Sequence, residues 1–95
     1  MKRQIRFRVH GRVQGVWFRQ STLRRARELG IAGWVANCPD GTVEGVAQGE
    51  EESLLSFEGW LHSGPPLAEV LKVDVTRESL ETVFEEFSNK GSGSR

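Results

Sequence analysis

Hydrophobic and polar residues alternate near the start of the chain. Ile5, Phe7 and Val9 fall on one side of this segment, and polar side chains fall on the other. A period of two predicts a half-buried strand. Over residues 18–29 the apolar spacing changes to that of a helix, and Gly30 is typical of a left-handed helix end. The chain therefore begins with a predicted strand and a predicted helix.

The remainder of the chain predicts a hairpin, a second helix and further strands. Cys38-Pro39-Asp40-Gly41 is a turn, because proline removes a backbone donor and Asp-Gly supplies the hairpin geometry. The acidic run Glu50-Glu51-Glu52 is typical of a helix start, since carboxylates are stabilised at the positive end of the helix dipole. The predicted elements are strands at residues 31–37, 42–48, 71–76 and 83–88 and a helix over residues 50–61.

The order of these elements is β-α-β-β-α-β, which is the signature of the ferredoxin-like α+β sandwich. In this fold we expect an antiparallel sheet with two helices on one face. Residues 1–88 are predicted to form a single domain, as the length of 95 residues suggests. Residues 89–95 are polar and rich in glycine and serine, which predicts a flexible tail.

Charge is unevenly distributed along the chain, although the net charge is zero. Residues 1–27 contain nine basic residues and no acidic residue, so the rest of the chain carries the opposite excess. This asymmetry favours an anionic partner near the N-terminal elements. The alternative is that these arginines lie on solvated faces and are partly neutralised by acids from the second half.

Composition also limits the class of protein. No apolar run is long enough to span a membrane, and the basic N-terminus lacks the apolar core of a secretory signal. The single cysteine, Cys38, allows no internal disulfide and fits a reducing cytosol. We therefore expect a cytoplasmic, monomeric protein with no membrane partner.

The segment Gly11-Arg12-Val13-Gln14-Gly15-Val16-Trp17-Phe18-Arg19 joins the first strand to the first helix. A glycine-bearing turn at a helix start brings backbone N–H groups together where the helix dipole favours negative charge. Arg19 adds a planar guanidinium that binds two phosphate oxygens at once. We therefore predict a phosphate site made by this loop and Arg19.

Topology places Asn37 beside this loop. Both strands of a strand–helix–strand crossover run in the same direction, so their ends share one edge of the domain with the helix start. Arg19 and Asn37 should therefore flank one depression. Asparagine often bonds the turn that it precedes. Next to a phosphate loop we favour a second role, in which its amide holds and orients a water molecule.

The side chains available limit the chemistry of such a site. His10 and His62 lie in different elements, and the spacing of ligands for a metal ion is absent. Cys38 has no evident histidine partner, and the loop lacks the Walker A pattern. We therefore expect neither a metal nor a cofactor.

Phosphoryl transfer needs few protein groups, because the protein mainly positions the reactants and neutralises charge on the phosphoryl oxygens. The leaving group is the demanding part. An alkoxide needs a proton or a metal, whereas a carboxylate, whose conjugate acid has a pKa of roughly 4, needs neither. A site with one arginine, loop amides and one asparagine therefore suits an acyl phosphate, the mixed anhydride of a carboxylic acid and phosphoric acid.

Two segments resemble the signatures of the acylphosphatase family. Residues 11–19 match Gly-x-Val-Gln-Gly-Val-x-Phe-Arg, and residues 33–44 match Gly-aromatic-Val-x-Asn-x-x-Asp-Gly-x-Val-Glu. The resemblance implies metal-independent hydrolysis of acyl phosphates to carboxylate and inorganic phosphate. It implies that Arg19 and Asn37 are catalytic and that Asn37 orients the nucleophilic water. It also implies that the phosphate is bound by Arg19 and by the loop amides of Gln14, Gly15, Val16, Trp17 and Phe18.

Two places of the chain leave alternatives open. The family usually ends in aromatic-x-Ile-Arg, where this chain has Phe87-Ser88-Asn89-Lys90, so the last strand is expected to be short or displaced. Trp17 fills a variable place of the first signature, and it either lines the acyl pocket or has a buried scaffold role.

Inorganic phosphate and other anions are expected to compete with the substrate.

Two rival functions follow from the same fold. A ferredoxin-like sheet also binds RNA by stacking bases on aromatic side chains of its open face. The open-face positions expected on residues 4–10 and 42–48 include no aromatic residue and the net charge is zero, so no nucleic-acid partner is expected. The other rival is a non-catalytic anion-binding or regulatory domain, which turnover of an acyl phosphate separates from an enzyme.

Overall fold

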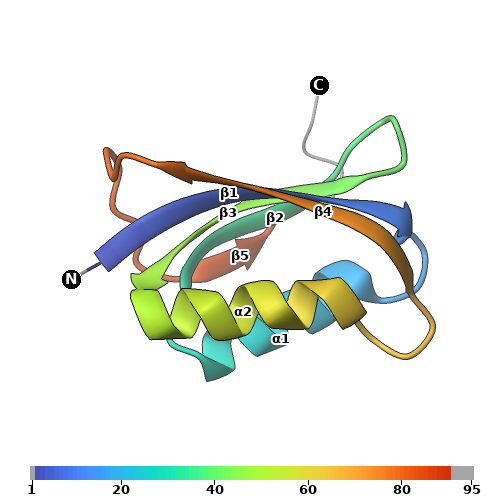
Figure 1. Ribbon diagram of the computed structural model, residues 1–95, viewed down its shortest axis with the longest axis horizontal. Helices are drawn as coiled ribbons and strands as arrows, with labels where there is room; N and C mark the ends of the chain where they lie inside the picture. Colours follow the sequence, from blue (N-terminus) through green and yellow to red (C-terminus); the bar gives the residue numbers. More distant parts are fainter. Residues whose placement is uncertain (1, 91–95) are drawn as a thin grey trace.

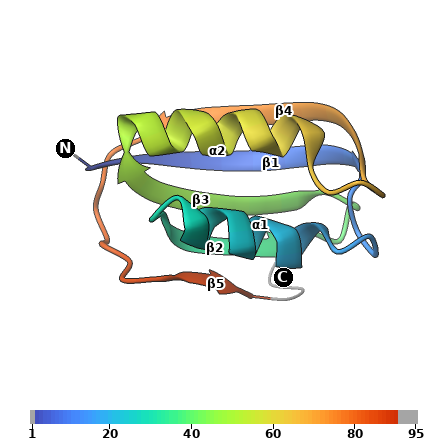
Figure 2. The same ribbon diagram turned by 90° about the horizontal axis from the view of Figure 1, so that it is seen from below.

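A sheet and two helices form the two layers of the domain. A computed structural model describes residues 2–90 of the chain. Figure 1 and Figure 2 show both helices on the same face of the sheet, which confirms the predicted α+β class. In chain order the elements are β1 (Lys2–Arg12), α1 (Phe18–Glu28), β2 (Ala32–Asn37), β3 (Val43–Glu50), α2 (Glu51–Ser63), β4 (Glu69–Glu78) and β5 (Phe87–Asn89).

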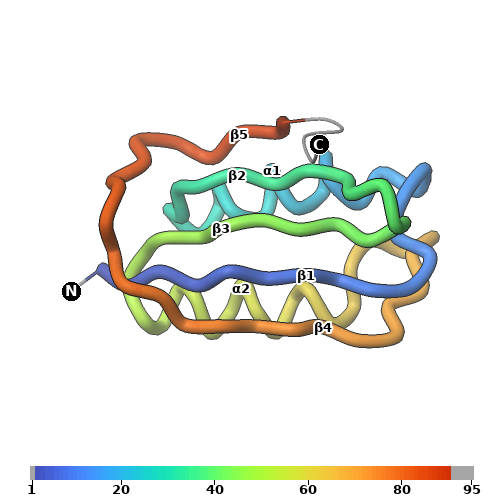
Figure 3. The backbone as a smooth tube through the Cα atoms, turned by 90° about the horizontal axis from the view of Figure 1, so that it is seen from above, coloured from blue at the N-terminus to red at the C-terminus, as the bar shows by residue number. Residues whose placement is uncertain are grey.

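The strands lie in the order β4-β1-β3-β2-β5 across the sheet. β1 pairs antiparallel with β3 and β4, and β3 pairs antiparallel with β2. β5 pairs parallel with β2, so the sheet is mixed and the prediction of an antiparallel sheet is wrong at this edge. The reason is the connection after β4, which crosses the end of the sheet before β5 begins (Figure 3). β1, β2 and β5 consequently run in the same direction.

The last strand is short and lies later in the chain than predicted. The sequence predicts a strand over residues 83–88, whereas β5 spans Phe87–Asn89. Asn89 therefore belongs to the sheet, although the sequence assigns it to the tail. Residues 91–95, which make up most of the predicted tail, lie outside the described residues.

Aromatic rings connect the sheet to α2. Phe7 in β1, Phe57 in α2 and Phe87 in β5 are each at most 1% exposed. The ring centroids of Phe7 and Phe57 lie 5.5 Å apart, and those of Phe57 and Phe87 lie 6.0 Å apart, both in edge-to-face geometry. Burial of a phenylalanine side chain contributes about 1.5–3 kcal/mol. Phe87 therefore anchors a strand of only three residues at the edge of the sheet.

The sheet face away from the helices carries ion pairs between the basic N-terminal segment and acids that follow residue 27. The Arg6 guanidinium lies 2.7 Å from the Glu78 carboxylate, and Arg8 lies 3.2 Å from Asp40 and 2.8 Å from Glu44. The hydrogen bond from Arg6 holds the pKa of the Glu78 carboxyl below its ordinary value of 4.5. For these two arginines, acids from later in the chain neutralise the N-terminal charge: Glu78 of the second half for Arg6, but Asp40 and Glu44 of the first half for Arg8.

Trp34 lies on the same open face. It is opposite Val46, which is in turn opposite Arg6. The ammonium group of Lys90 lies 4.7 Å from the centre of the indole ring. Trp34 thus adds an aromatic ring to a face on which β1 and β3 place none.

Within residues 2–90, neither helix combines the length and apolar character needed to cross a membrane.

Candidate active site

The loop between β1 and α1 has an unusual backbone and is fastened by a side chain. Gly15 and Trp17 have φ values of 74° and 65°, a left-handed region that glycine adopts readily and tryptophan rarely. The side-chain amide of Gln14 donates to the carbonyl oxygens of Cys38 at 2.8 Å and Thr42 at 2.9 Å. These two bonds hold the loop against the turn between β2 and β3.

The N-terminus of α1 presents backbone donors to this loop. The Ser21 N–H donates to the Trp17 carbonyl at 2.9 Å, and it is the first bond of the helix. The N–H groups of residues 18–20 therefore have no helical partner. No side chain caps the helix, and its first turn contains no acidic residue. The positive end of the helix dipole is thus available to an anion.

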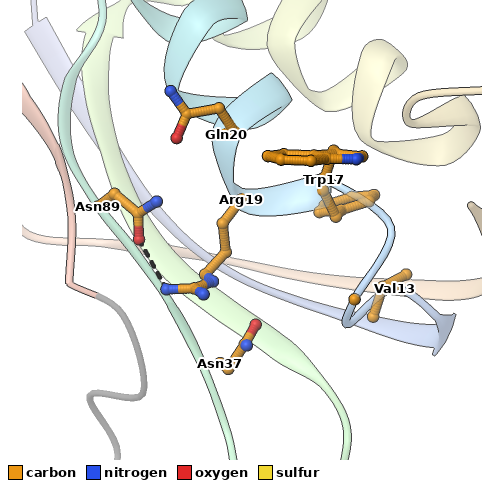
Figure 4. A pocket seen from close by; sticks show the side chains of 8 residues that line it. Val13, Trp17, Arg19, Gln20, Asn37 and Asn89 are labelled. Atoms are coloured by element: carbon orange, nitrogen blue, oxygen red, sulfur yellow. Dashed lines mark hydrogen bonds between the residues drawn. The ribbon is translucent and has the colours of Figure 1, made fainter.

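Arg19 is the second residue of α1, and its side chain extends toward Asn37 and Asn89 (Figure 4). Its Nη1 donates to Oδ1 of Asn89 at 2.9 Å. Asn89 contributes a neutral amide, so this contact orients the guanidinium without neutralising its charge. A guanidinium held in this way retains donors for a planar, doubly hydrogen-bonded contact with phosphate oxygens.

Asn37 is the last residue of β2 and lies next to the loop, as the topology predicts. Its Oδ1 atom is buried and has no hydrogen-bond partner within residues 2–90. The turn that follows is bonded instead by the Asp40 carboxylate, which accepts from the backbone and side chain of Thr42. These bonds hold the pKa of the Asp40 carboxyl below its ordinary value of 3.8. Oδ1 of Asn37 is therefore an unused hydrogen-bond acceptor of a residue that lines the pocket described next.

A pocket of about 320 Å³ lies between these elements. Two of the predicted phosphate residues do not line it. The Gln14 side chain bonds the neighbouring turn, and Val16 packs against the core. The other predicted residues line the pocket, namely Gly15, Trp17, Phe18, Arg19 and Asn37. Three residues that the sequence did not indicate also line it: Val13, Gln20 and Asn89.

The direction of β5 explains why Asn89 reaches this pocket. β1, β2 and β5 run the same way, so the loop after β1, Asn37 at the end of β2 and Asn89 at the end of β5 meet at one edge of the sheet. The sequence contains a signal for this residue, because asparagine replaces the isoleucine usual in the family at that place. Because β5 runs parallel to β2, this asparagine lies at the pocket and contacts Arg19.

The polar groups of the pocket are a guanidinium, side-chain amides and backbone N–H groups. Within residues 2–90, no group of three or more histidine, cysteine, aspartate or glutamate side chains is placed to hold a metal ion. Guanidinium and N–H groups are donors, so the pocket matches an anion with several acceptor oxygens. A phosphoryl group meets this requirement.

Comparison with known proteins identifies the family. The sequence model of the acylphosphatase family matches residues 5–89. An acylphosphatase from Thermococcus kodakarensis is 54% identical over 82 residues, which are 85% of this chain and 90% of that protein. An acylphosphatase from Methylococcus capsulatus is 50% identical over 88 residues, with 93% and 95% of the two chains covered.

A solved structure agrees with these relatives. The acylphosphatase from Coxiella burnetii superposes with a TM-score of 0.89 at 39% identity, over 94% of this chain and 93% of that chain. The chain belongs to the acylphosphatase family, and it is an enzyme that hydrolyses acyl phosphates.

Proposed function

We propose that Arg19, Asn37 and the loop amides of residues 14–18 carry out this hydrolysis without a metal ion. The observation that carries the proposal is the convergence of the α1 N-terminus, Arg19 and Asn37 on one pocket. Water attacks phosphorus, the bond from phosphorus to the acyl oxygen breaks, and a carboxylate leaves. A phosphate oxygen takes the proton of the water.

In this proposal the loop amides and Arg19 bind the phosphoryl group. The uncapped start of α1 and the glycine at residue 15 support the role of the amides. Asn89 supports the role of Arg19, because it holds Nη1 while leaving the charge in place. Donors fixed in advance stabilise the charge on the phosphoryl oxygens in the transition state, and each is typically worth about 100- to 1,000-fold in rate.

Asn37 orients the attacking water. Its buried and unpartnered Oδ1 supports this role, since such an oxygen accepts a hydrogen bond from water and leaves the water lone pairs free. Asn37 does not act as a base, because an amide has no basic site near neutral pH. No protein acid is required either, because the carboxylate leaving group is stable as an anion.

Hydrolysis of benzoyl phosphate in the presence of EDTA tests this proposal. We expect Arg19→Ala and Asn37→Ala each to lower kcat/KM by about 100-fold or more. Arg24→Ala is the matched control, because Arg24 is an exposed arginine on the same helix and does not line the pocket. Wild-type activity in both site variants would place the chemistry elsewhere.

The same assay separates the enzyme from a non-catalytic domain. A wild-type protein that binds inorganic phosphate and hydrolyses no acyl phosphate would be an anion-binding domain. We expect inorganic phosphate to act as a competitive inhibitor because it offers the loop the same oxygens. The monomeric state and cytoplasmic location expected from the sequence remain predictions.

A further inference from the structure

Trp17 is an exposed aromatic residue in a rarely used backbone conformation. It is 73% exposed, which argues against the buried scaffold role. Within residues 2–90 it is the only residue other than glycine with a positive φ. A bulky side chain rarely adopts this conformation, and such strain is typical of functional sites. Packing in the core therefore does not account for the indole at this position.

The indole of Trp17 lies beside the phosphate-binding groups. Trp17 occupies the N-cap position of α1 without capping it, so its backbone adjoins the free N–H groups of the first turn while its side chain lines the pocket. Figure 4 shows the indole on one side of the pocket, whereas the Arg19 guanidinium extends toward Asn37 and Asn89. Val13 adds an apolar side chain to the same lining. The pocket thus has a polar side and an apolar side.

We propose that Trp17 recognises the acyl group of the substrate and favours acyl phosphates with an aromatic or broad apolar acyl group over small ones. The inference rests on the proposed function, because it takes the phosphoryl group to be bound by Arg19 and the loop. The acyl group is joined directly to that phosphoryl group and therefore lies next to the indole. An indole ring stacks on an aromatic ring and offers far less contact area to a methyl group.

The test compares benzoyl phosphate with acetyl phosphate in the wild type and three variants. Trp17→Gly removes the ring and keeps the left-handed backbone accessible. Trp17→Phe keeps an aromatic ring. Leu71→Ala is the control, because Leu71 is 82% exposed and does not line the pocket. The measured quantity is the ratio of kcat/KM for benzoyl phosphate to kcat/KM for acetyl phosphate.

We expect Trp17→Gly to lower this ratio by about three- to tenfold. The two substrates share the phosphoryl group, so any change in phosphate binding by the altered loop cancels in the ratio. Trp17→Phe should retain most of the wild-type preference for benzoyl phosphate, and Leu71→Ala should keep the wild-type ratio within about twofold. An unchanged ratio in Trp17→Gly would overturn the inference.

Binding of phosphonates tests the inference without turnover. Isothermal titration with benzylphosphonate and methylphosphonate gives a second ratio, which Trp17→Gly should lower to a similar extent. A wild-type protein that hydrolyses neither acyl phosphate contradicts the proposed function, while this second ratio still decides the role of Trp17. Equal affinity for the two phosphonates in the wild type would refute recognition by the indole.

Discussion

Replacement of Asn89 by alanine is expected to lower catalytic efficiency. The variant removes the oxygen that accepts from Arg19 Nη1 at 2.9 Å. A hydrogen bond to a charged group contributes about 1.5–3 kcal/mol. The contact is exposed to solvent, which lowers the value to about 0.5–1.5 kcal/mol. If this free energy, which holds the guanidinium in place, is lost from the transition state, kcat/KM for benzoyl phosphate falls about two- to tenfold.

Asn89→Asp separates geometry from charge. The substitution keeps an oxygen that accepts from Arg19 and adds a negative charge beside the proposed phosphate position. Two like charges about 4 Å apart repel by about 1 kcal/mol in water and by about 4 kcal/mol at a dielectric constant of 20. We therefore expect kcat/KM to fall about fivefold or more. The attraction between the introduced carboxylate and the Arg19 guanidinium should leave folding stability unimpaired.

The assay is steady-state hydrolysis together with urea unfolding of each variant. Ser88→Ala is the control, because Ser88 is an exposed residue of the same short strand. It should retain wild-type kcat/KM. The reasoning is refuted if Asn89→Ala keeps wild-type kcat/KM, or if Asn89→Asp raises it.

Three further predictions concern stability. Gly15→Ala should destabilise the protein by about 1–2 kcal/mol, because alanine is strained at a φ of 74°. Gly59→Ala in α2 should instead stabilise the protein by about 0.5–1 kcal/mol, because alanine favours the helix more than glycine does. An added Cβ meets no atom within 4 Å at either position, so steric clashes do not contribute. Urea unfolding measures whether each variant loses or gains stability. Glu78 has a pKa held below 4.5 by Arg6, so its contribution to stability is complete above pH 4.5 and is lost as the pH falls through its lowered folded-state pKa. Unfolding curves of the wild type and Glu78→Gln should therefore converge below pH 4.5, and a constant difference would contradict this.

Local sequence signals were sufficient for the part of the site that lies close together in the chain. The alternation of Ile5, Phe7 and Val9 gives the strand, and the glycine-bearing loop leads directly into the helix that carries Arg19. The position of Asn37 follows from the strand–helix–strand crossover, because the helix runs back between β1 and β2 and the two strands therefore run in the same direction. These predictions depend on short connections whose geometry has few solutions.

The sequence did not predict the contribution of β5. Its three residues are too few for a periodic signal, and a long connection does not determine whether the strand pairs parallel or antiparallel. The sequence therefore places Asn89 in the tail, although asparagine at this position departs from the family pattern. The sequence pattern predicts Trp34 to be a core residue, and this prediction is wrong, because its ring lies on the open face against Lys90. β2 is mostly apolar on both faces and lacks the alternation that shows which face a side chain takes.

The inhibition constant of inorganic phosphate, measured beside kcat/KM in Arg19→Ala and Asn37→Ala, tests the central claim most directly. The account predicts that both variants lose hydrolysis of benzoyl phosphate. It predicts that phosphate inhibition weakens strongly in Arg19→Ala and stays within about threefold of wild type in Asn37→Ala, because the first residue binds the phosphoryl group and the second orients water. Equal weakening of phosphate binding in both variants, or unchanged binding in Arg19→Ala, would contradict this division of roles.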